Sequence, residues 1–244
     1  MGRRSAREAD RAFVVEGAKV LGEALAAGVA VESVFVAPGT DDPVVDQAFA
    51  AGARLFELGP GVVERVADTV TPQPIMAIVP YVDVPLDRLA GASFVVVMVD
   101  VRDPGNAGTV LRSAEAAGAS GVVCCRGSVD VFNPKTVRAS AGSVFHVPVV
   151  VGGDALLVLE QVGGWGLRRL GAAARGGDDY ADLDLRQPVA FVLGNEASGL
   201  PDEVSETGLD ALVTIPMAGR TESLNVGMAA AVLCFETARQ RRRG

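Results

Sequence analysis

The sequence predicts an α/β protein built around a parallel sheet with helices on both faces. Valine-rich runs of strand length alternate with helical patterns, and the run from Phe94 to Val99 is apolar throughout. Uniformly apolar strands are typical of parallel sheets that are buried on both faces. The chain has 244 residues, of which 49% are hydrophobic, so it is long enough for one large domain or for a small and a medium one.

The first 80 residues predict a small alternating α/β unit. Its first element is expected to be a helix over residues 6–27, because Phe13, Leu21 and Leu25 fall on one helical stripe. Ser5 is the expected N-cap of this helix, and Gly28 is its expected end. The elements expected after it are a strand at 31–36, a helix at 43–51, a strand at 54–58, a short helix at 61–67 and a strand at 75–79.

A larger unit of the same kind is expected after residue 92. Residues 81–92 show little periodicity and contain turn-forming proline, so we expect a linker between domains at 1–80 and 93–244. The elements expected in the second domain are strands at 94–100, 121–125, 167–173, 188–193 and 211–215, and helices at 107–117, 134–141 and 225–240.

Three segments that follow predicted strands combine glycine with small polar residues. They are Asp103-Pro104-Gly105-Asn106-x-Gly108-x-x-x-Arg112, Leu193-Gly194-Asn195-Glu196-x-x-Gly199-Leu200 and Ile215-Pro216-Met217-x-Gly219-x-x-x-Ser223-Leu224-Asn225. Ligands of open parallel sheets bind beyond the carboxyl ends of the strands, so we expect the three segments to form one site. Their amide, hydroxyl and guanidinium groups suit a ribose or a phosphate, and they include no metal-ligand cluster and no histidine base.

Each segment, taken alone, also has a structural explanation. Asn106 is expected at the N-cap of the helix that carries Arg112, and Arg112 could equally form a surface ion pair. Glu196, Ser223 and Asn225 could likewise serve only as helix caps. Neither a G-x-G-x-x-G nor a G-x-x-x-x-G-K-[ST] pattern is present, so a nucleotide-dependent dehydrogenase lacks its sequence motif.

The charge of the chain is unevenly distributed. The net charge is −8, yet eight arginines gather at the two ends, namely Arg3, Arg4, Arg7, Arg11, Arg239, Arg241, Arg242 and Arg243. Without these arginines, and without Glu8 and Asp10, 14 basic and 28 acidic residues remain. Basic ends on an acidic body can neutralise a few phosphates, or they can simply keep the termini solvated.

The sequence predicts a cytoplasmic protein with no membrane segment and no metal site. The apolar runs are far shorter than the roughly 18 to 20 residues that span a bilayer, and no apolar segment follows Arg3 and Arg4 to form a signal peptide. Cys124, Cys125 and Cys234 show no C-x-x-C spacing, so they are interpreted as buried core thiols.

Together, the order and spacing of the three segments resemble the three motifs of the SpoU/TrmH family of RNA ribose 2′-O-methyltransferases, in the SPOUT superfamily. The stretch from Asn133 to Ser143, with Phe145-His146-Val147-Pro148 after it, is also similar to this family. Near the N-terminus, Arg11-x-Phe13-x-x-Glu16-Gly17 resembles the family's small substrate-binding domain, which is of the ribosomal-protein L30e type. The resemblance covers most of the chain.

The resemblance implies a fold and a cofactor. It implies an L30e-like domain at 1–80 and, at 93–244, a parallel-sheet SPOUT domain whose C-terminal segment forms a deep trefoil knot. It further implies that S-adenosylmethionine is bound by the knotted loops, largely through backbone groups. The cofactor-binding residues carried over from the family are Leu193, Gly194, Asn195, Glu196, Ile215, Met217, Leu224 and Asn225.

The resemblance also implies catalytic roles for Arg112, Asn106, Ser223 and Asn225. A guanidinium is effectively always protonated, so we interpret Arg112 as a group that binds the adjacent phosphate and stabilises the developing alkoxide, not as a base. Ser223 and Asn106 are expected to orient the ribose hydroxyl. The only histidine, His146, lies in a Val/Pro context and is interpreted as structural.

The expected partners are RNA and a second copy of the chain. Family resemblance implies a homodimer packed through the knotted domains, with Arg112 and Ser223 contributed by opposite subunits. Ribosomal RNA is the first choice of substrate, because an L30e-type domain with basic ends suits a structured loop, and transfer RNA remains open. The alternative from another class is a non-catalytic RNA-binding or assembly factor on the same fold.

Overall fold

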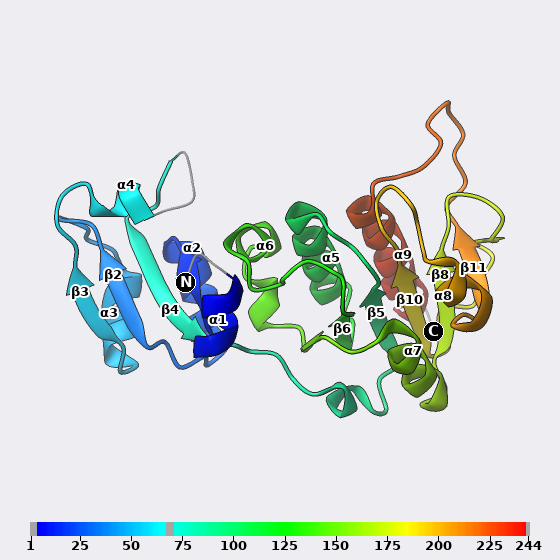
Figure 1. The fold of residues 1–244 in the computed structure, drawn as a ribbon, viewed down its shortest axis with the longest axis horizontal. Helices are drawn as coiled ribbons and strands as arrows, with labels where there is room; N and C mark the ends of the chain where they lie inside the picture. The colour runs from blue at the N-terminus through cyan, green and yellow to red at the C-terminus, as the bar shows by residue number, and fades with distance from the viewer. Residues whose placement is uncertain (1–3, 67–70, 243–244) are drawn as a thin grey trace.

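The computed structural model describes residues 4–66 and 71–242, which form two sheets joined by a connecting segment (Figure 1). The N-terminal lobe has a four-stranded mixed sheet in the order β1-β4-β2-β3, in which only β2 and β3 are parallel. Its strands are β1 (Ala12–Glu16), β2 (Ser33–Val36), β3 (Arg54–Glu57) and β4 (Ile75–Pro80). Its helices are α1 (Arg4–Asp10), α2 (Ala18–Ala26), α3 (Pro43–Ala50) and α4 (Val62–Val66).

The expected single helix over residues 6–27 is wrong, because this stretch contains α1, β1 and α2. Phe13 and Val15 face the core as part of β1, where they pair with Val79 and Ala77 of β4. Arg11, with φ of 49°, ends α1, and Gly17, with φ of 94°, begins α2. The helical stripe arose because β-branched and aromatic residues of a short strand also fit a helical spacing.

The C-terminal lobe confirms the predicted parallel sheet. Every pairing in its seven-stranded sheet is parallel, in the order β7-β6-β5-β10-β8-β11-β9 among the described residues. The strands are β5 (Phe94–Met98), β6 (Gly121–Cys124), β7 (Val149–Val151), β8 (Arg168–Ala172), β9 (Asp178–Asp179), β10 (Val189–Leu193) and β11 (Ala211–Thr214). The helices are α5 (Pro104–Ala116), α6 (Pro134–Ser140), α7 (Ala155–Gly164), α8 (Asp202–Thr207) and α9 (Val226–Arg241), with 3-10 turns η1 (Leu86–Leu89) and η2 (Ser143–Phe145).

Helices cover both faces of the centre of this sheet, which explains why β5, β6 and β10 are buried along their whole length. Phe94, Val96 and Met98 of β5 belong to a core that includes residues of α5 and α9. Val95 and Val97 belong to a second core with residues of α7 and α8. Alternate residues of one strand therefore enter different cores, and both sets have to be hydrophobic.

The two lobes share the first of these cores (Figure 1). Phe13 of β1 lies 4.9 Å from Phe132 between ring centroids, and Tyr81 stacks on Phe132 at 4.1 Å. The Arg7 guanidinium, which is 2% exposed, donates to the Asp130 carboxylate at 2.5 and 3.0 Å. These buried contacts fix the N-terminal lobe against α6 and the loop that precedes it.

Besides β1, the elements that were not expected from the sequence are β7, α7, α8, the two-residue strand β9 and the 3-10 turns η1 and η2. Within the described residues no helix has the length and apolar character needed to cross a membrane. All three cysteines are buried, as expected, and burial raises the pKa of each thiol to about 12.

Candidate functional site

The three glycine-containing segments meet at the carboxyl edge of the large sheet. Met98 at the end of β5 is paired with Leu193 at the end of β10, so the first two segments leave the sheet side by side. β11, which precedes the third segment, is separated from β10 only by β8. The third segment returns to the same edge because Asn225 caps α9 there through hydrogen bonds to the N–H groups of Gly227 and Met228.

The helix of the first segment starts earlier than the sequence suggested. The expectation that Asn106 is the N-cap is wrong, because Asp103 occupies that position and accepts a hydrogen bond from the Asn106 N–H at 2.8 Å. Pro104 can begin the helix since the first helical N–H has no partner within the helix. The Asn106 side chain is thereby released from capping and is available for other contacts.

A chain of side-chain hydrogen bonds connects all three segments through Asn106. The Asn106 Nδ2 donates to Glu196 Oε1 at 3.0 Å, and Asn106 Oδ1 accepts from Asn225 Nδ2 at 2.7 Å. Asn106 is 9% exposed, so these bonds are shielded from water. One residue from each segment therefore belongs to the same network, which we call the Asn106 network (Glu196, Asn106 and Asn225).

Glu196 is held as an anion at one end of this network. Its carboxylate also accepts from the backbone N–H groups of Arg102 at 3.2 Å and Asp103 at 3.0 Å. Partial burial by itself would raise the pKa of Glu196, but the hydrogen bonds from Asn106, Asp103 and Arg102 outweigh it and leave this pKa below its ordinary value. The negative charge is thus stabilised beside the start of α5.

Asn195 shapes the turn of the second segment. Its Nδ2 donates to the carbonyl of Asp100 at 3.0 Å, while its Oδ1 accepts from the N–H groups of Ala197 and Ser198. Asn195 and Gly199 also form a backbone bridge, and Gly199 has φ of 73°. A side chain at Gly194 would meet the backbone of Gly199 and Leu200, so this tight turn requires glycine.

A cavity opens beside the network, and the second and third segments line most of it. Seven of the predicted site residues are in its wall, namely Gly194, Asn195, Glu196, Ile215, Met217, Ser223 and Leu224. The remaining wall residues are Ala172, Ala173, Ala174, Ala197, Gly199, Val213, Val226, Ala229 and Leu233. The wall is mainly apolar, and among the described residues Glu196 is its only ionisable side chain.

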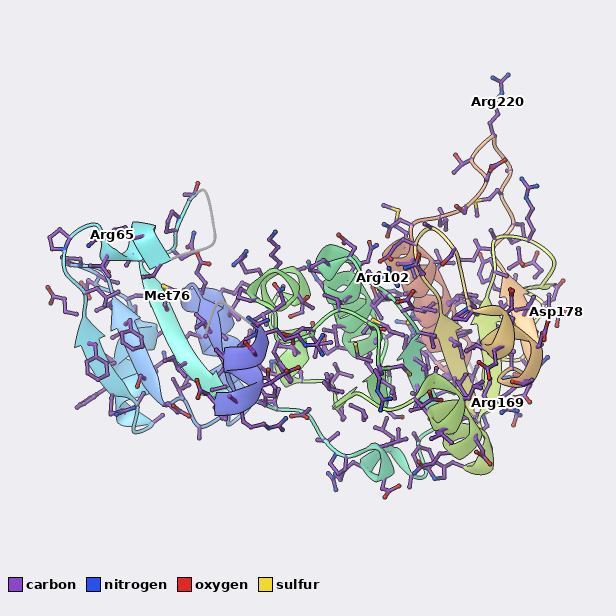
Figure 2. All side chains as sticks on the ribbon, in the orientation of Figure 1. Arg65, Met76, Arg102, Arg169, Asp178 and Arg220 are labelled. Carbon is purple, nitrogen blue, oxygen red and sulfur yellow. The ribbon has the colours of Figure 1, made fainter. Side chains whose placement is uncertain are left out.

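Other predicted residues lie outside this wall. Leu193 is fully buried within β10, and Asn106 and Asn225 lie in the network next to the cavity. Sequence reasoning missed the alanines that follow β8, because the sequence does not reveal that β8 lies between β10 and β11. The loop that carries Ser223 extends beyond the body of the lobe, and Figure 2 shows Arg220 at its tip.

Arg112 lies on a different part of the same chain. It is six positions after Asn106 on α5, about 9 Å along the helix axis and about 240° around it. The exposed Arg112 side chain lines a separate depression with residues of α2 and with His146. A single chain therefore does not bring Arg112 to the cavity that contains Ser223.

Most of the terminal arginines within the described residues are already engaged. Arg4, Arg11 and Arg239 form ion pairs with Glu8, Asp83 and Glu236, in addition to the buried pair of Arg7 with Asp130. Arg241 donates to the carbonyls of Leu185, Ser93 and Gln187. Of these arginines, Arg7 and Arg241 join distant segments of the fold, whereas Arg3 and Arg243 lie outside the described part of the chain.

No group of three or more His, Cys, Asp and Glu side chains is arranged to hold a metal ion within the described residues. His146 instead contacts Glu23, with Nε2 and Oε2 2.8 Å apart, and so links the two lobes.

Comparison with known proteins gives matches over both lobes. A model of the SpoU rRNA Methylase family matches residues 93–235, and a model of an MRM3-like substrate binding domain matches residues 1–77. The chain is 34% identical over 223 residues to the 23S rRNA (guanosine(2553)-2′-O)-methyltransferase RlmP of Bacillus subtilis, covering 91% of this chain and 87% of that protein. It is 36% identical over 177 residues to the 23S rRNA (uridine(2479)-2′-O)-methyltransferase of Streptomyces viridochromogenes, covering 70% of this chain and 61% of that protein.

Solved structures resemble the whole chain. The SpoU methyltransferase AviRb from Streptomyces viridochromogenes, in complex with the cofactor AdoMet, matches with a TM-score of 0.90 at 29% identity, covering 100% of this chain and 95% of that one. An AdoMet-bound rRNA methyltransferase from Sinorhizobium meliloti matches with a TM-score of 0.81 at 32% identity, covering 98% of this chain and 91% of that one.

Proposed function

The chain belongs to the SpoU rRNA methylase family, and from this premise we propose that it transfers a methyl group from S-adenosylmethionine to a ribose 2′-hydroxyl of ribosomal RNA. The observation that carries the proposal is the Asn106 network, which joins all three segments beside one cavity. The two relatives named above are 2′-O-methyltransferases of 23S rRNA, which favours ribosomal over transfer RNA.

The residues of the cavity fit S-adenosylmethionine. When bound, this cofactor supplies a methyl group on a positively charged sulfur, and the cavity wall contains the anion of Glu196. Apolar side chains such as Ile215, Met217 and Leu224 suit an adenine ring. Gly194 lets the backbone approach closely, while Leu193, Asn195 and Asn225 complete the predicted cofactor-binding set around it.

The polar side chains have separate roles in binding the RNA and in methyl transfer. Asn106 and Ser223 orient the ribose hydroxyl, since Asn106 still has one N–H and one lone pair beyond those used in the network. Arg112 binds the neighbouring phosphate and stabilises the negative charge that develops on the ribose oxygen. Because a guanidinium stays protonated, Arg112 does not accept the ribose proton.

The active unit in this proposal is a homodimer. Arg112 lies away from the cavity of its own chain, so a partner's cavity would receive it. α9 offers an apolar stripe for the interface, in which Met228 is 60% and Phe235 48% exposed and Val232 lies between them at helical spacing. The same lobe is proposed to carry the trefoil knot of the family, with the segment from Ile215 to Asn225 as its last loop.

The N-terminal lobe is proposed to bind RNA, as the name of its matching family model suggests. The proposed domains are residues 1–80 for substrate binding, 81–92 as the linker and 93–244 for methyl transfer. The cytoplasm, where ribosomal RNA is available, is the proposed location.

The test combines cofactor binding with methyl transfer. Isothermal titration is expected to show binding of S-adenosylmethionine, and unmethylated 23S rRNA made by transcription is expected to accept labelled methyl groups at a ribose. Arg112→Lys keeps the charge but loses the planar fork, so it is expected to lower kcat about 100-fold while cofactor affinity stays unchanged.

Two results would contradict the proposal. Absence of S-adenosylmethionine binding would favour a non-catalytic RNA-binding factor on the same fold. Near-wild-type turnover of Arg112→Lys would show that a bidentate guanidinium is not required.

A further inference from the structure

A depression between the two lobes contains charged groups that the site described above does not use. We call it the α2–α5 depression, and it is lined by Lys19, Glu23, Arg112, Glu115, Ala116, Ala141, Ser143 and His146. Lys19 and Glu23 belong to α2 of the N-terminal lobe, whereas Arg112 and Glu115 belong to α5. The depression is therefore the place where the N-terminal lobe comes next to the arginine of the first motif.

Two cations in the α2–α5 depression have no carboxylate partner among the described residues. Lys19 and Glu23 are four positions apart on α2, a spacing at which they could pair, but Glu23 Oε2 lies 2.8 Å from His146 Nε2 instead. Glu115 is three positions from Arg112, yet it contacts the Ser143 hydroxyl instead, which donates to Glu115 Oε2 at 3.5 Å. The side chains of Lys19 and Arg112 are both exposed.

Contacts between the lobes hold α2 in this position. The Arg138 guanidinium of α6 donates to Glu16, directly before α2, at 3.0 Å, and the Glu16 side chain is 5% exposed. Gly142, with φ of 99°, packs so closely against Glu23 that a side chain there would collide with it. The position of Lys19 relative to Arg112 is thus set by packing.

We propose that Lys19 and Arg112 together bind the phosphodiester backbone of the RNA next to the nucleotide that is methylated. This inference rests on the proposed function and extends it by assigning an RNA contact to the N-terminal lobe. Two exposed, unpaired cations that line one depression suit a polyanion, because each can neutralise a phosphate and release counterions. The neighbouring carboxylates of Glu23 and Glu115 are occupied and so compete less for the two cations.

The test measures binding and methylation of transcribed, unmethylated 23S rRNA by the full chain. Lys19→Ala is expected to weaken filter-binding affinity about tenfold, the lower end of what a hydrogen bond to a charged group contributes, and to raise KM similarly. The slope of log affinity against log salt should become shallower by about 0.7 to 0.9, which corresponds to one lost phosphate contact. Affinity for S-adenosylmethionine and thermal stability should stay unchanged.

Arg88→Ala is the matched control, because Arg88 is another exposed cation without an ion pair among the described residues, located in η1. If both cations bind the same stretch of RNA backbone, the losses in affinity caused by Lys19→Ala and Arg112→Ala should not be independent. The double variant should then lose less RNA affinity than the product of the two single-variant losses. The inference would be overturned if Lys19→Ala and Arg88→Ala showed the same RNA affinity and the same salt dependence of binding. It would also be overturned if the wild-type chain did not bind this RNA. RNA binding without methyl transfer would instead contradict the proposed function. In that case, the change in salt dependence caused by Lys19→Ala would still test whether Lys19 binds a phosphate.

Discussion

At the scale of single residues, Asn106 is the position on which the site depends. Its N–H is bound by the Asp103 cap, its amide nitrogen donates to Glu196, and its amide oxygen accepts from Asn225. An aspartate at this position would place a carboxylate against Glu196, and an alanine would remove the side-chain hydrogen bonds to both Glu196 and Asn225. The amide is required because one side chain must donate in one direction and accept in the other.

The sequence pointed to Asn106, Glu196 and Asn225 through the combined spacing of three segments. The sequence prediction put the N-cap of α5 at Asn106 instead of Asp103. Both residue types are good N-caps, and the choice depends on where Pro104 starts the helix. The sequence also could not show that the side chains of the three segments bond to one another. Side-chain pairing across 90 or more residues depends on the order of strands, which the sequence does not state.

Replacing Glu196 with glutamine is expected to destabilise the chain in a pH-dependent way. Glutamine keeps one oxygen, but its NH₂ group would face a backbone N–H of Arg102 or Asp103, so one hydrogen bond becomes a donor–donor contact. Because Glu196 is partly exposed, we expect a loss of about 1 kcal/mol in the free energy of unfolding at pH 7.

The pH dependence has a definite sign. The pKa of Glu196 is lower in the folded chain than its ordinary value, so its contribution is complete above the pKa of the unfolded chain, which is about 4.3, and is lost as pH falls through the folded value. Urea unfolding of wild type and Glu196→Gln at pH 7, 5 and 3.5 should show a difference that shrinks only at the lowest pH. Glu222→Gln, at an exposed ion pair with Arg175, is the control and should show little difference at any pH. If wild type and Glu196→Gln differed in unfolding free energy by the same amount at all three pH values, ionisation of Glu196 would not be the source of the difference.

At the scale of elements, the sequence predicted the long apolar strands well and the short or boundary elements poorly. β5, β6 and β10 are apolar because both faces are buried, so they were recognisable without their partners. β1 was hidden inside a helical pattern, and β9 has only two residues. The alanines after β8 entered the cavity wall unforeseen because strand order, not local sequence, puts them there.

Adding a single methyl group to α5 can test how closely α5 packs against α6. A side chain at Gly108 would overlap the Ala139 side chain and lie 2.8 Å from the Ala139 carbonyl carbon. Alanine favours helix by about 1 kcal/mol over glycine, but overpacking of this kind costs about 1 to 3 kcal/mol. Gly108→Ala is therefore expected to lower the free energy of unfolding by up to about 2 kcal/mol in urea titrations.

Gly164→Ala provides the matched comparison. Gly164 ends α7, and a side chain there would meet no atom within 4 Å. The same substitution should leave stability unchanged or raise it by up to about 1 kcal/mol. Equal effects of the two variants would mean that the α5–α6 contact does not exclude a methyl group.

At the scale of the whole molecule, the lobes are joined by a common core. Phe13 and Phe132 pack between the sheets, and the buried Arg7–Asp130 pair lies beside them. This joint determines where α2 lies relative to α5, and hence where Lys19 lies relative to Arg112. Within one chain, however, Arg112 and the cavity that contains Ser223 remain on different sides of the lobe.

Mixing two inactive variants tests whether two chains complete one site. Arg112→Ala and Ser223→Ala are each expected to lose most methyltransferase activity as separate proteins. If opposite subunits supply these residues, a heterodimer of the two variants contains one site with both residues intact and one site with neither. Random reassortment makes about half of the dimers mixed, so activity should recover to about a quarter of the wild-type level.

The mixing experiment distinguishes a site shared between two subunits from a site made within one chain, because a site within one chain cannot be restored by mixing the two variants. Each variant chain would then carry its own defect into every dimer, and the mixture would stay as inactive as its components. Phe235→Asp supplies the control, since a charge in the exposed apolar stripe of α9 should prevent dimer formation. Introduced into both variants, Phe235→Asp should abolish the recovery and shift the sedimentation coefficient to that of a monomer. Recovery that persists in monomers would contradict both the shared site and the interface assigned to α9.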